Sequence, residues 1–151
     1  MNTPLEIRQL AKERLEEATI LAANQKFDGA FYLAGYSVEL MLKAKICDLW
    51  DIPNLFAEGN NNSQMGVSYL RKAVQIHDLN VLLFFSGLKK DFDKDKINNR
   101  FLNKAINLLF NAWSEKSRYK PCGFHKDNDV KALIKILSDP NKGLLQWIEN
   151  K

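Results

Sequence analysis

Residues 27–50 read FDGAFYLAGYSVELMLKAKICDLW, and this apolar run is the part of the sequence that decides the fold. Its hydrophobic residues fall on nearly every side of a helix, and a helix that is apolar all round is expected at the centre of a protein. Asp28 is expected to cap a helix that begins at about Gly29. The sequence Asp51-Ile52-Pro53 is expected to end it after Trp50. These residues predict a buried central helix.

Two charged residues, Glu39 and Lys43, interrupt the apolar run and lie one helical turn apart on one face. One interpretation is an exposed ion pair in the favourable order, which contributes only a few tenths of a kcal/mol. The other is that the pair lines a polar pocket and contacts Arg118, because a buried charge needs a partner. The sequence leaves both interpretations open.

Helical patterns flank the central helix on both sides. Thr3, Pro4 and Glu6 form a capping-box signal for a first helix that extends to about Asn24. Residues 54–68 are rich in asparagine and glycine and predict a long mobile connection. Later helical segments are expected at 69–74, at 79–88, from Asp93 or Asp95 to Trp113, at 130–137 with a cap at Asp127 or Asp129, and at 143–151. The chain therefore predicts an all-α fold, an antiparallel bundle of four to five main helices plus a short C-terminal helix.

Length and composition are those of one globular domain covering residues 1–151, with 46% hydrophobic and 26% charged residues. The N-terminal sequence MNTPLEIRQL lacks the apolar core of a signal peptide, and no apolar run reaches the length of a membrane span, so we expect a cytoplasmic protein. The two cysteines, Cys47 and Cys122, match no metal-binding spacing and predict reduced thiols. We therefore expect neither a metal site nor a cofactor.

The segment from Glu115 to His125 contains the residues best suited to chemistry. Arg118 offers a planar fork of donors that matches phosphate, and His125 can exchange a proton near neutral pH. Lys116, Lys120 and Lys126 surround this pair and outnumber the one acid of the segment, Glu115. The segment therefore predicts either an anion-binding site or a solvated basic loop.

The triplet His77-Asp78-Leu79 opens another helical pattern. Asp78 is well placed near the positive N-terminal end of that helix. His77 is interpreted as a capping or surface histidine.

Four pieces of the sequence resemble the HEPN domains, small all-α bundles of prokaryotic toxin–antitoxin and defence systems and of nucleotidyltransferase-linked proteins. The pieces are an N-terminal helix, the helix of residues 27–44, the triplet His77-Asp78-Leu79, and Trp113 followed by Arg118-Tyr119. Together they span nearly the whole chain. In the ribonuclease members of the family, an arginine followed four to six residues later by a histidine forms the catalytic motif. Arg118 and His125 are separated by six residues and match it.

This resemblance implies metal-independent cleavage of RNA, in which a ribose 2′-hydroxyl attacks the neighbouring phosphate. It implies that His125 acts as general base or acid and that Arg118 stabilises the charge developing on the phosphate. It further implies supporting or ligand-binding roles, among them orientation of the arginine and stacking on a base. The residues given these supporting roles are Glu39, Lys43, Tyr119, Lys116 and Lys120.

Sites of this family lie across a two-fold dimer, so the resemblance also implies a homodimer with residues 115–126 near the axis. An alternative is a non-catalytic nucleotide-binding or interaction module, partnered with a nucleotidyltransferase or an antitoxin. A third interpretation makes the charged residues a structural network that specifies helix packing. Fold resemblance cannot choose among these functions.

Overall fold

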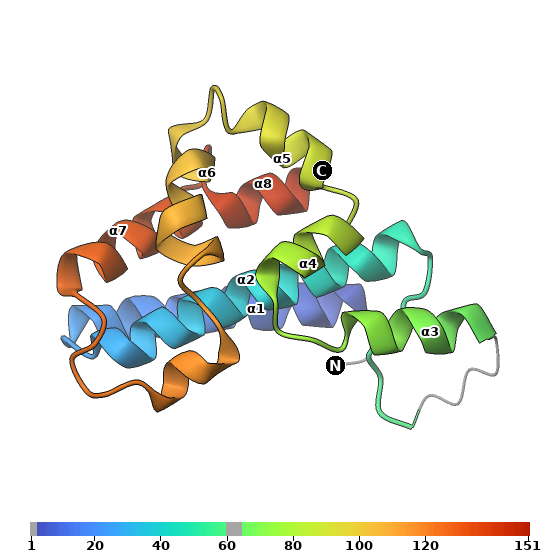
Figure 1. Cartoon of the computed structure of the whole chain (residues 1–151), viewed down its shortest axis with the longest axis horizontal. Helices are drawn as coiled ribbons and strands as arrows, with labels where there is room; N and C mark the ends of the chain where they lie inside the picture. Colours follow the sequence, from blue (N-terminus) through green and yellow to red (C-terminus); the bar gives the residue numbers. More distant parts are fainter. Residues whose placement is uncertain (1–2, 60–64) are drawn as a thin grey trace.

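The computed structural model describes residues 3–59 and 65–151, and over these residues the chain forms eight α-helices and no strand (Figure 1). The predicted all-α class is confirmed. A π-helical turn, η1, follows α6, and a 3-10 helix, η2, precedes α7. The elements are α1 (Pro4–Ala23), α2 (Phe27–Leu49), α3 (Met65–Val74), α4 (Leu79–Phe85), α5 (Lys89–Asp95), α6 (Arg100–Ala105), η1 (Ile106–Phe110), η2 (Glu115–Tyr119), α7 (Asp127–Ser138) and α8 (Leu144–Asn150).

The two long helices α1 and α2 form an antiparallel pair along one side of the molecule (Figure 1). The capping box at the start of α1 is confirmed: the backbone N–H of Thr3 donates to Glu6 Oε2 at 3.0 Å, and that of Glu6 donates to Thr3 Oγ1 at 3.2 Å. The chain reverses direction at Gln25, whose φ of 60° is the left-handed conformation of a tight turn.

Helix α2 is the central helix, as its apolar sequence predicts, and it packs against α1, α4, α7, α8 and η2. It begins at Phe27, and Asp28 does not cap it. The expected cap is therefore wrong. Asp28 lies within the first turn, where its carboxylate accepts from the backbone N–H groups of Gly123 at 2.7 Å and His125 at 3.0 Å. A residue from the central helix thus holds the distant loop.

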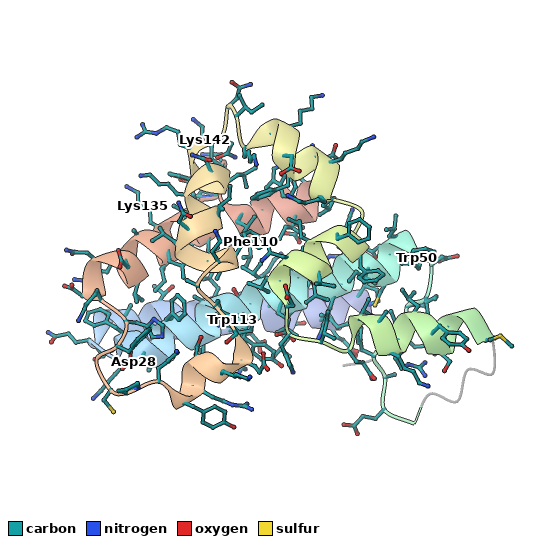
Figure 2. All side chains as sticks on the ribbon, in the orientation of Figure 1. Asp28, Trp50, Phe110, Trp113, Lys135 and Lys142 are labelled. Carbon is teal, nitrogen blue, oxygen red and sulfur yellow. The ribbon has the colours of Figure 1, made fainter. Side chains whose placement is uncertain are left out.

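Helix α2 also makes a close approach to the indole ring of Trp113. A Cβ atom at Gly35 would lie 2.2 Å from Trp113 Cδ1 and Nε1, so only glycine leaves room for the ring. The indole N–H donates to the backbone carbonyl of Tyr32 at 3.1 Å, and Trp113 is 6% exposed. This contact fixes the chain immediately before η2 (Figure 2).

The second half of the chain contains more and shorter helices than the sequence pattern predicts. The expected helix from Asp93 or Asp95 to Trp113 is replaced by α5, α6 and η1. The break occurs because the side chain of Asn99 accepts from the N–H groups of Phe101 and Leu102, at 3.0 and 3.3 Å, and starts a new helix there.

Other boundaries differ from the expected ones as well. Helix α3 already begins at Met65, inside the connection expected at 54–68, of which residues 60–64 lie outside the described residues. Neither Asp127 nor Asp129 caps α7; both lie in its first turn, where their charge suits the positive end of the helix. The described chain therefore has eight α-helices, where four to five main helices and a short C-terminal helix were predicted.

Buried side chains from all eight α-helices form one hydrophobic cluster, which joins both halves of the described chain. Its largest fully buried members include Leu40, Leu42, Leu82, Leu102 and Leu133. In the part of the chain that the structure describes, no helix is both long enough and apolar enough to span a bilayer.

Candidate functional site

The most unusual residue of the core is Glu39, a carboxylate that is only 1% exposed in the middle of α2. Lys43, one turn later on the same helix, donates to Glu39 Oε1 at 2.7 Å. His77 Nδ1 lies 3.0 Å from both Oε1 and Oε2 of the same carboxylate. Burial of a carboxylate is costly unless it is paired and hydrogen-bonded, and here two cation-forming side chains meet that need.

His77 reaches Glu39 because of how α4 begins. Asp78 caps α4, accepting from the N–H groups of Asn80 at 2.9 Å and Val81 at 3.1 Å. The expected position of Asp78 at a helix N-terminus is confirmed. The cap belongs to Asp78, so His77, one residue earlier, is not the capping residue. Its side chain is half exposed, and its inner edge contacts the carboxylate.

A hollow of about 300 Å³ opens above this triad. Its polar side is formed by Glu39, Lys43 and His77. Lys43 Nζ also lies 5.5 Å from the ring centre of Phe56, which follows α2 in the chain. Burial, and next the charge of Glu39, raise the pKa of Tyr36 at the same hollow. The remaining lining residues are Ile7, Tyr36, Leu40, Phe56 and Gln75.

The arrangement offers hydrogen-bond donors beside aromatic surfaces. An ionised carboxylate only accepts, so Nδ1 of His77 carries the proton in its contact with Glu39, and Nε2 is left at the exposed edge of the ring. Lys43 has three donors and uses one on Glu39. The hollow can therefore hold an anionic group near Lys43 and His77, with a flat apolar group against Phe56 or Tyr36.

Arg118 lies elsewhere, on the exposed side of η2. Its guanidinium carbon is 4.9 Å from the ring centre of Tyr119, and interactions with Tyr119 and Tyr32 raise its pKa. The hydrogen bonds, ion pairs and ring contacts of the described residues do not join Arg118 to Glu39 or to His125. The partner that the sequence predicted for the Glu39–Lys43 pair is supplied by His77.

The cations expected to support Arg118 are also on the surface. Lys116 and Lys120 are exposed, and Tyr119 is 75% exposed. Lys120 Nζ lies 5.0 Å from the ring centre of Phe124. This segment is therefore an exposed basic corner next to the loop that carries His125.

His125 packs against the beginning of α2. Its ring stacks on Phe31, with ring centres 3.9 Å apart and planes 21° apart. Burial lowers the pKa of His125, which favours the neutral imidazole. The backbone N–H of His125, followed by that of Gly123, lowers the pKa of Asp28, so the carboxylate that holds this loop stays ionised.

The imidazole of His125 borders a small hollow of about 180 Å³, which it shares with residues of η1 and α7. Its Nε2 atom is buried and has no hydrogen-bond partner among the described residues. An unsatisfied buried polar atom is uncommon and calls for an explanation such as a chemical role. His125 is thus a separate candidate from the Glu39 pocket.

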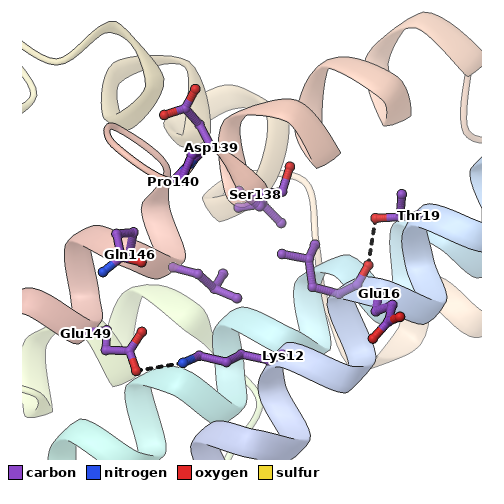
Figure 3. Close-up of a pocket in the computed structure, with 11 residues that line it drawn as sticks. Lys12, Glu16, Thr19, Ser138, Asp139, Pro140, Gln146 and Glu149 are labelled. Carbon is purple, nitrogen blue, oxygen red and sulfur yellow. Dashed lines mark hydrogen bonds and ion pairs between the residues drawn. The ribbon is translucent and has the colours of Figure 1, made fainter.

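Another hollow, of about 320 Å³, lies between α1, α7 and α8 (Figure 3). Lys12 Nζ donates to Glu149 Oε1 at 2.8 Å at its edge, and the Thr19 hydroxyl donates to the carbonyl of Leu15 at 2.9 Å. These polar groups satisfy one another, so the hollow is a weaker candidate than the Glu39 pocket.

Sequence reasoning missed His77, Phe56 and Gln75 as neighbours of Glu39. The available signal was physical, because a carboxylate inside an apolar helix requires partners, and histidine is one of the few side chains that can supply them. His77 is 38 residues from Glu39, so no spacing rule links the two. Among the described residues, no three His, Cys, Asp or Glu side chains are grouped as potential metal ligands.

Comparisons with models of protein families, with curated proteins and with solved structures give no match to this chain.

Proposed function

We propose that the chain is a HEPN-like helical bundle that serves as a binding module and holds a nucleotide in the Glu39–Lys43–His77 pocket. The observation that carries this proposal is the buried Glu39 carboxylate, which fixes Lys43 at 2.7 Å and His77 at 3.0 Å beside a hollow. Two pieces of the HEPN resemblance, the helix of residues 27–44 and the triplet His77-Asp78-Leu79, supply these three side chains.

In this proposal each part of the pocket recognises one part of the nucleotide. The phosphate accepts hydrogen bonds from Lys43 and from protonated His77, because charge-assisted bonds are the stronger ones. The base lies against Phe56 or Tyr36, since aromatic stacking suits a flat heterocycle. Glu39 orients Lys43 and His77 and does not contact the ligand itself. A nucleotidyltransferase is the partner that such a module would serve.

We expect saturable binding of ATP, used as the probe, by isothermal titration calorimetry. His77→Ala removes one charge-assisted hydrogen bond and is expected to weaken binding about tenfold. The variant leaves Lys43 as the partner of the buried Glu39 carboxylate, and a thermal melt checks that it is folded. Lys90→Ala changes an exposed lysine on α5 that does not line the pocket, and it is expected to bind as the unmodified protein does. Absent binding, or equal affinities for the two variants, would contradict the proposal.

A second candidate function is metal-independent endoribonuclease activity by a homodimer. The observation that favours it is His125, whose pKa is lowered by burial, whose ring borders a hollow, and whose buried Nε2 has no hydrogen-bond partner among the described residues. A neutral imidazole with an available nitrogen can accept the proton of a ribose 2′-hydroxyl. Arg118 is exposed, so in this proposal it approaches the phosphate as a second copy of the chain completes the cleft.

We expect such an enzyme to cleave RNA in the presence of EDTA. His125→Ala is expected to lower the rate by about 10²–10⁴-fold, the usual contribution of general acid–base catalysis. The chain has two histidines, so His77→Ala is the matched control and is expected to retain cleavage. Cleavage that requires a metal, or that survives in the folded His125 variant, would exclude this function.

A further inference from the structure

A second strongly charged region lies on the face formed by α6, α7 and the turn between α7 and α8. A hollow of about 370 Å³ is lined there by four basic side chains, and none of its lining residues is acidic. Figure 2 shows two of them, Lys135 and Lys142, on the side of the molecule near α6. The basic groove is defined by these four residues, Arg100, Lys104, Lys135 and Lys142, with Asn98 and Phe101 as its other lining.

The four cations of the basic groove are exposed, and none of them is within ion-pair distance of a carboxylate among the described residues. Some lysines elsewhere are paired with a carboxylate, as Lys89 and Lys96 are with Asp93. Like charges around one hollow repel each other, and an anion between them relieves that repulsion.

The acids nearest to the groove are already engaged. Asp139 accepts from the backbone N–H groups of Asn141 at 2.9 Å and Lys142 at 2.7 Å, which lower its pKa. Asp95 accepts from the indole of Trp147 at 2.9 Å and pairs with Lys151 at 2.9 Å. Both carboxylates remain charged, and Asp139 interacts at longer range with Lys135 and Lys142, but neither forms an ion pair with any of the four cations of the groove.

The groove continues into a neighbouring hollow. Asn98 and Lys142 line both hollows, and the second adds Lys94, which is also exposed. Five cations from α5, α6, α7 and the turn before α8 therefore line the two adjoining hollows, and the one acid among the lining residues, Asp95, pairs with Lys151. A track of this kind fits an extended chain of anions better than a single small anion.

We propose that the basic groove binds the phosphodiester backbone of single-stranded nucleic acid. Lysine ammonium groups are point charges that suit phosphates, and Arg100 adds a fork for two phosphate oxygens. The hollow is of small-molecule size, so a flexible strand can place a phosphate in it while a duplex cannot enter. The half-buried ring of Phe101 offers a surface on which a base can stack. This inference is independent of the nucleotide pocket, because the two regions share no residue.

The test is fluorescence anisotropy with a labelled oligothymidine about 12 nucleotides long, within the usual span of single-strand sites. A DNA probe has no 2′-hydroxyl, so the proposed ribonuclease reaction cannot destroy it. Three to four phosphate contacts, at about 0.7 each, predict a slope of about −2 to −3 for log K against log salt. The double reversal Lys104→Glu/Lys135→Glu removes two of these contacts, so it is expected to weaken binding at least about tenfold and to reduce that slope by about 1.4.

The matched control is Lys72→Glu/Lys90→Glu, which changes the net charge by the same amount at exposed positions outside the groove. It is expected to keep most of the affinity. Circular dichroism confirms that each variant is folded. Equal losses in the two double variants would overturn the proposal, because binding would then follow net charge alone. Displacement of the probe by polyglutamate as effectively as by unlabelled DNA would overturn it in favour of an acidic protein partner.

Discussion

Gly35→Ala is expected to destabilise the protein by roughly 2 kcal/mol, although alanine is the better helix former. The new methyl group would lie 2.2 Å from Trp113 Cδ1 and Nε1, so the indole must leave its position against α2. Displacement of the ring also breaks its hydrogen bond to the carbonyl of Tyr32. Urea unfolding followed by circular dichroism measures the change in the free energy of unfolding.

The effect of Gly35→Ala on stability is expected to change sign when the indole ring of Trp113 is removed. Trp113→Ala alone costs about 3–5 kcal/mol, because a large buried side chain is lost. In that background Gly35→Ala meets no obstacle and stabilises the helix by up to about 1 kcal/mol. Gly66→Ala is the control, because a Cβ atom there contacts nothing within 4 Å. Additive effects of the two substitutions would show that Gly35 and Trp113 are not in contact.

The second large effect is expected at the buried ion pair. Lys43→Met keeps the length of the side chain but leaves the buried Glu39 carboxylate without its ammonium partner. Breaking a buried pair in this way is expected to cost about 3–5 kcal/mol at neutral pH. The double variant Glu39→Gln/Lys43→Met is expected to recover most of that loss, because no buried charge then remains.

Lys89→Met is the matched control for this prediction. Lys89 and Asp93 form a pair with the same spacing of four residues, but both side chains are about half exposed. Solvent screening makes such a pair contribute little, so the variant is expected to unfold almost as the unmodified protein does. If Lys43→Met lowered the free energy of unfolding as little as Lys89→Met, the Glu39 carboxylate would be accessible to solvent, and the prediction would be wrong.

Both predictions concern contacts of α2. The sequence of this helix predicted some of its features and not others. Its central position followed from an apolar pattern on all faces, since such a helix has no side that water tolerates. The sequence did not predict the role of Gly35, because a glycine in a helix can face open solvent as well as a closely packed side chain. The difference depends on Trp113, which is 78 residues later and is placed by the packing of η1 and η2.

Local side-chain chemistry explains which helix boundaries were predictable. Thr3 and Glu6 cap α1 through bonds to residues three positions away, so the sequence alone identified this cap. For Asp78 the sequence indicated only a position near the helix N-terminus, and the structure shows that it is the cap. Asp28 has the same local signal, yet its carboxylate binds the backbone of Gly123 and His125. A tertiary partner replaced the local one, and that partner is not visible in the sequence around Asp28.

In the candidate site too, some residues were identified from the sequence and others only from the structure. Glu39 and Lys43 were identified from the sequence, because two charges one turn apart in an apolar helix require an explanation. His77 was interpreted as a surface or capping residue, and its contact with Glu39 depends on how α4 packs across α2. The roles expected for Arg118 and His125 stay predictions, since the contacts of one protomer do not join them.

The sequence by itself determined the all-α class, the buried central helix, the capped start of α1, the position of Asp78 near the start of α4, and the pair Glu39–Lys43. These features depend on hydrophobic periodicity and on bonds between near neighbours, and both can be recognised from residues that lie close together in the sequence. Only the tertiary structure decided that His77 completes the pair, that Asp28 holds the His125 loop, and that four distant cations line one groove. Such contacts depend on the relative packing of helices, which no local pattern encodes.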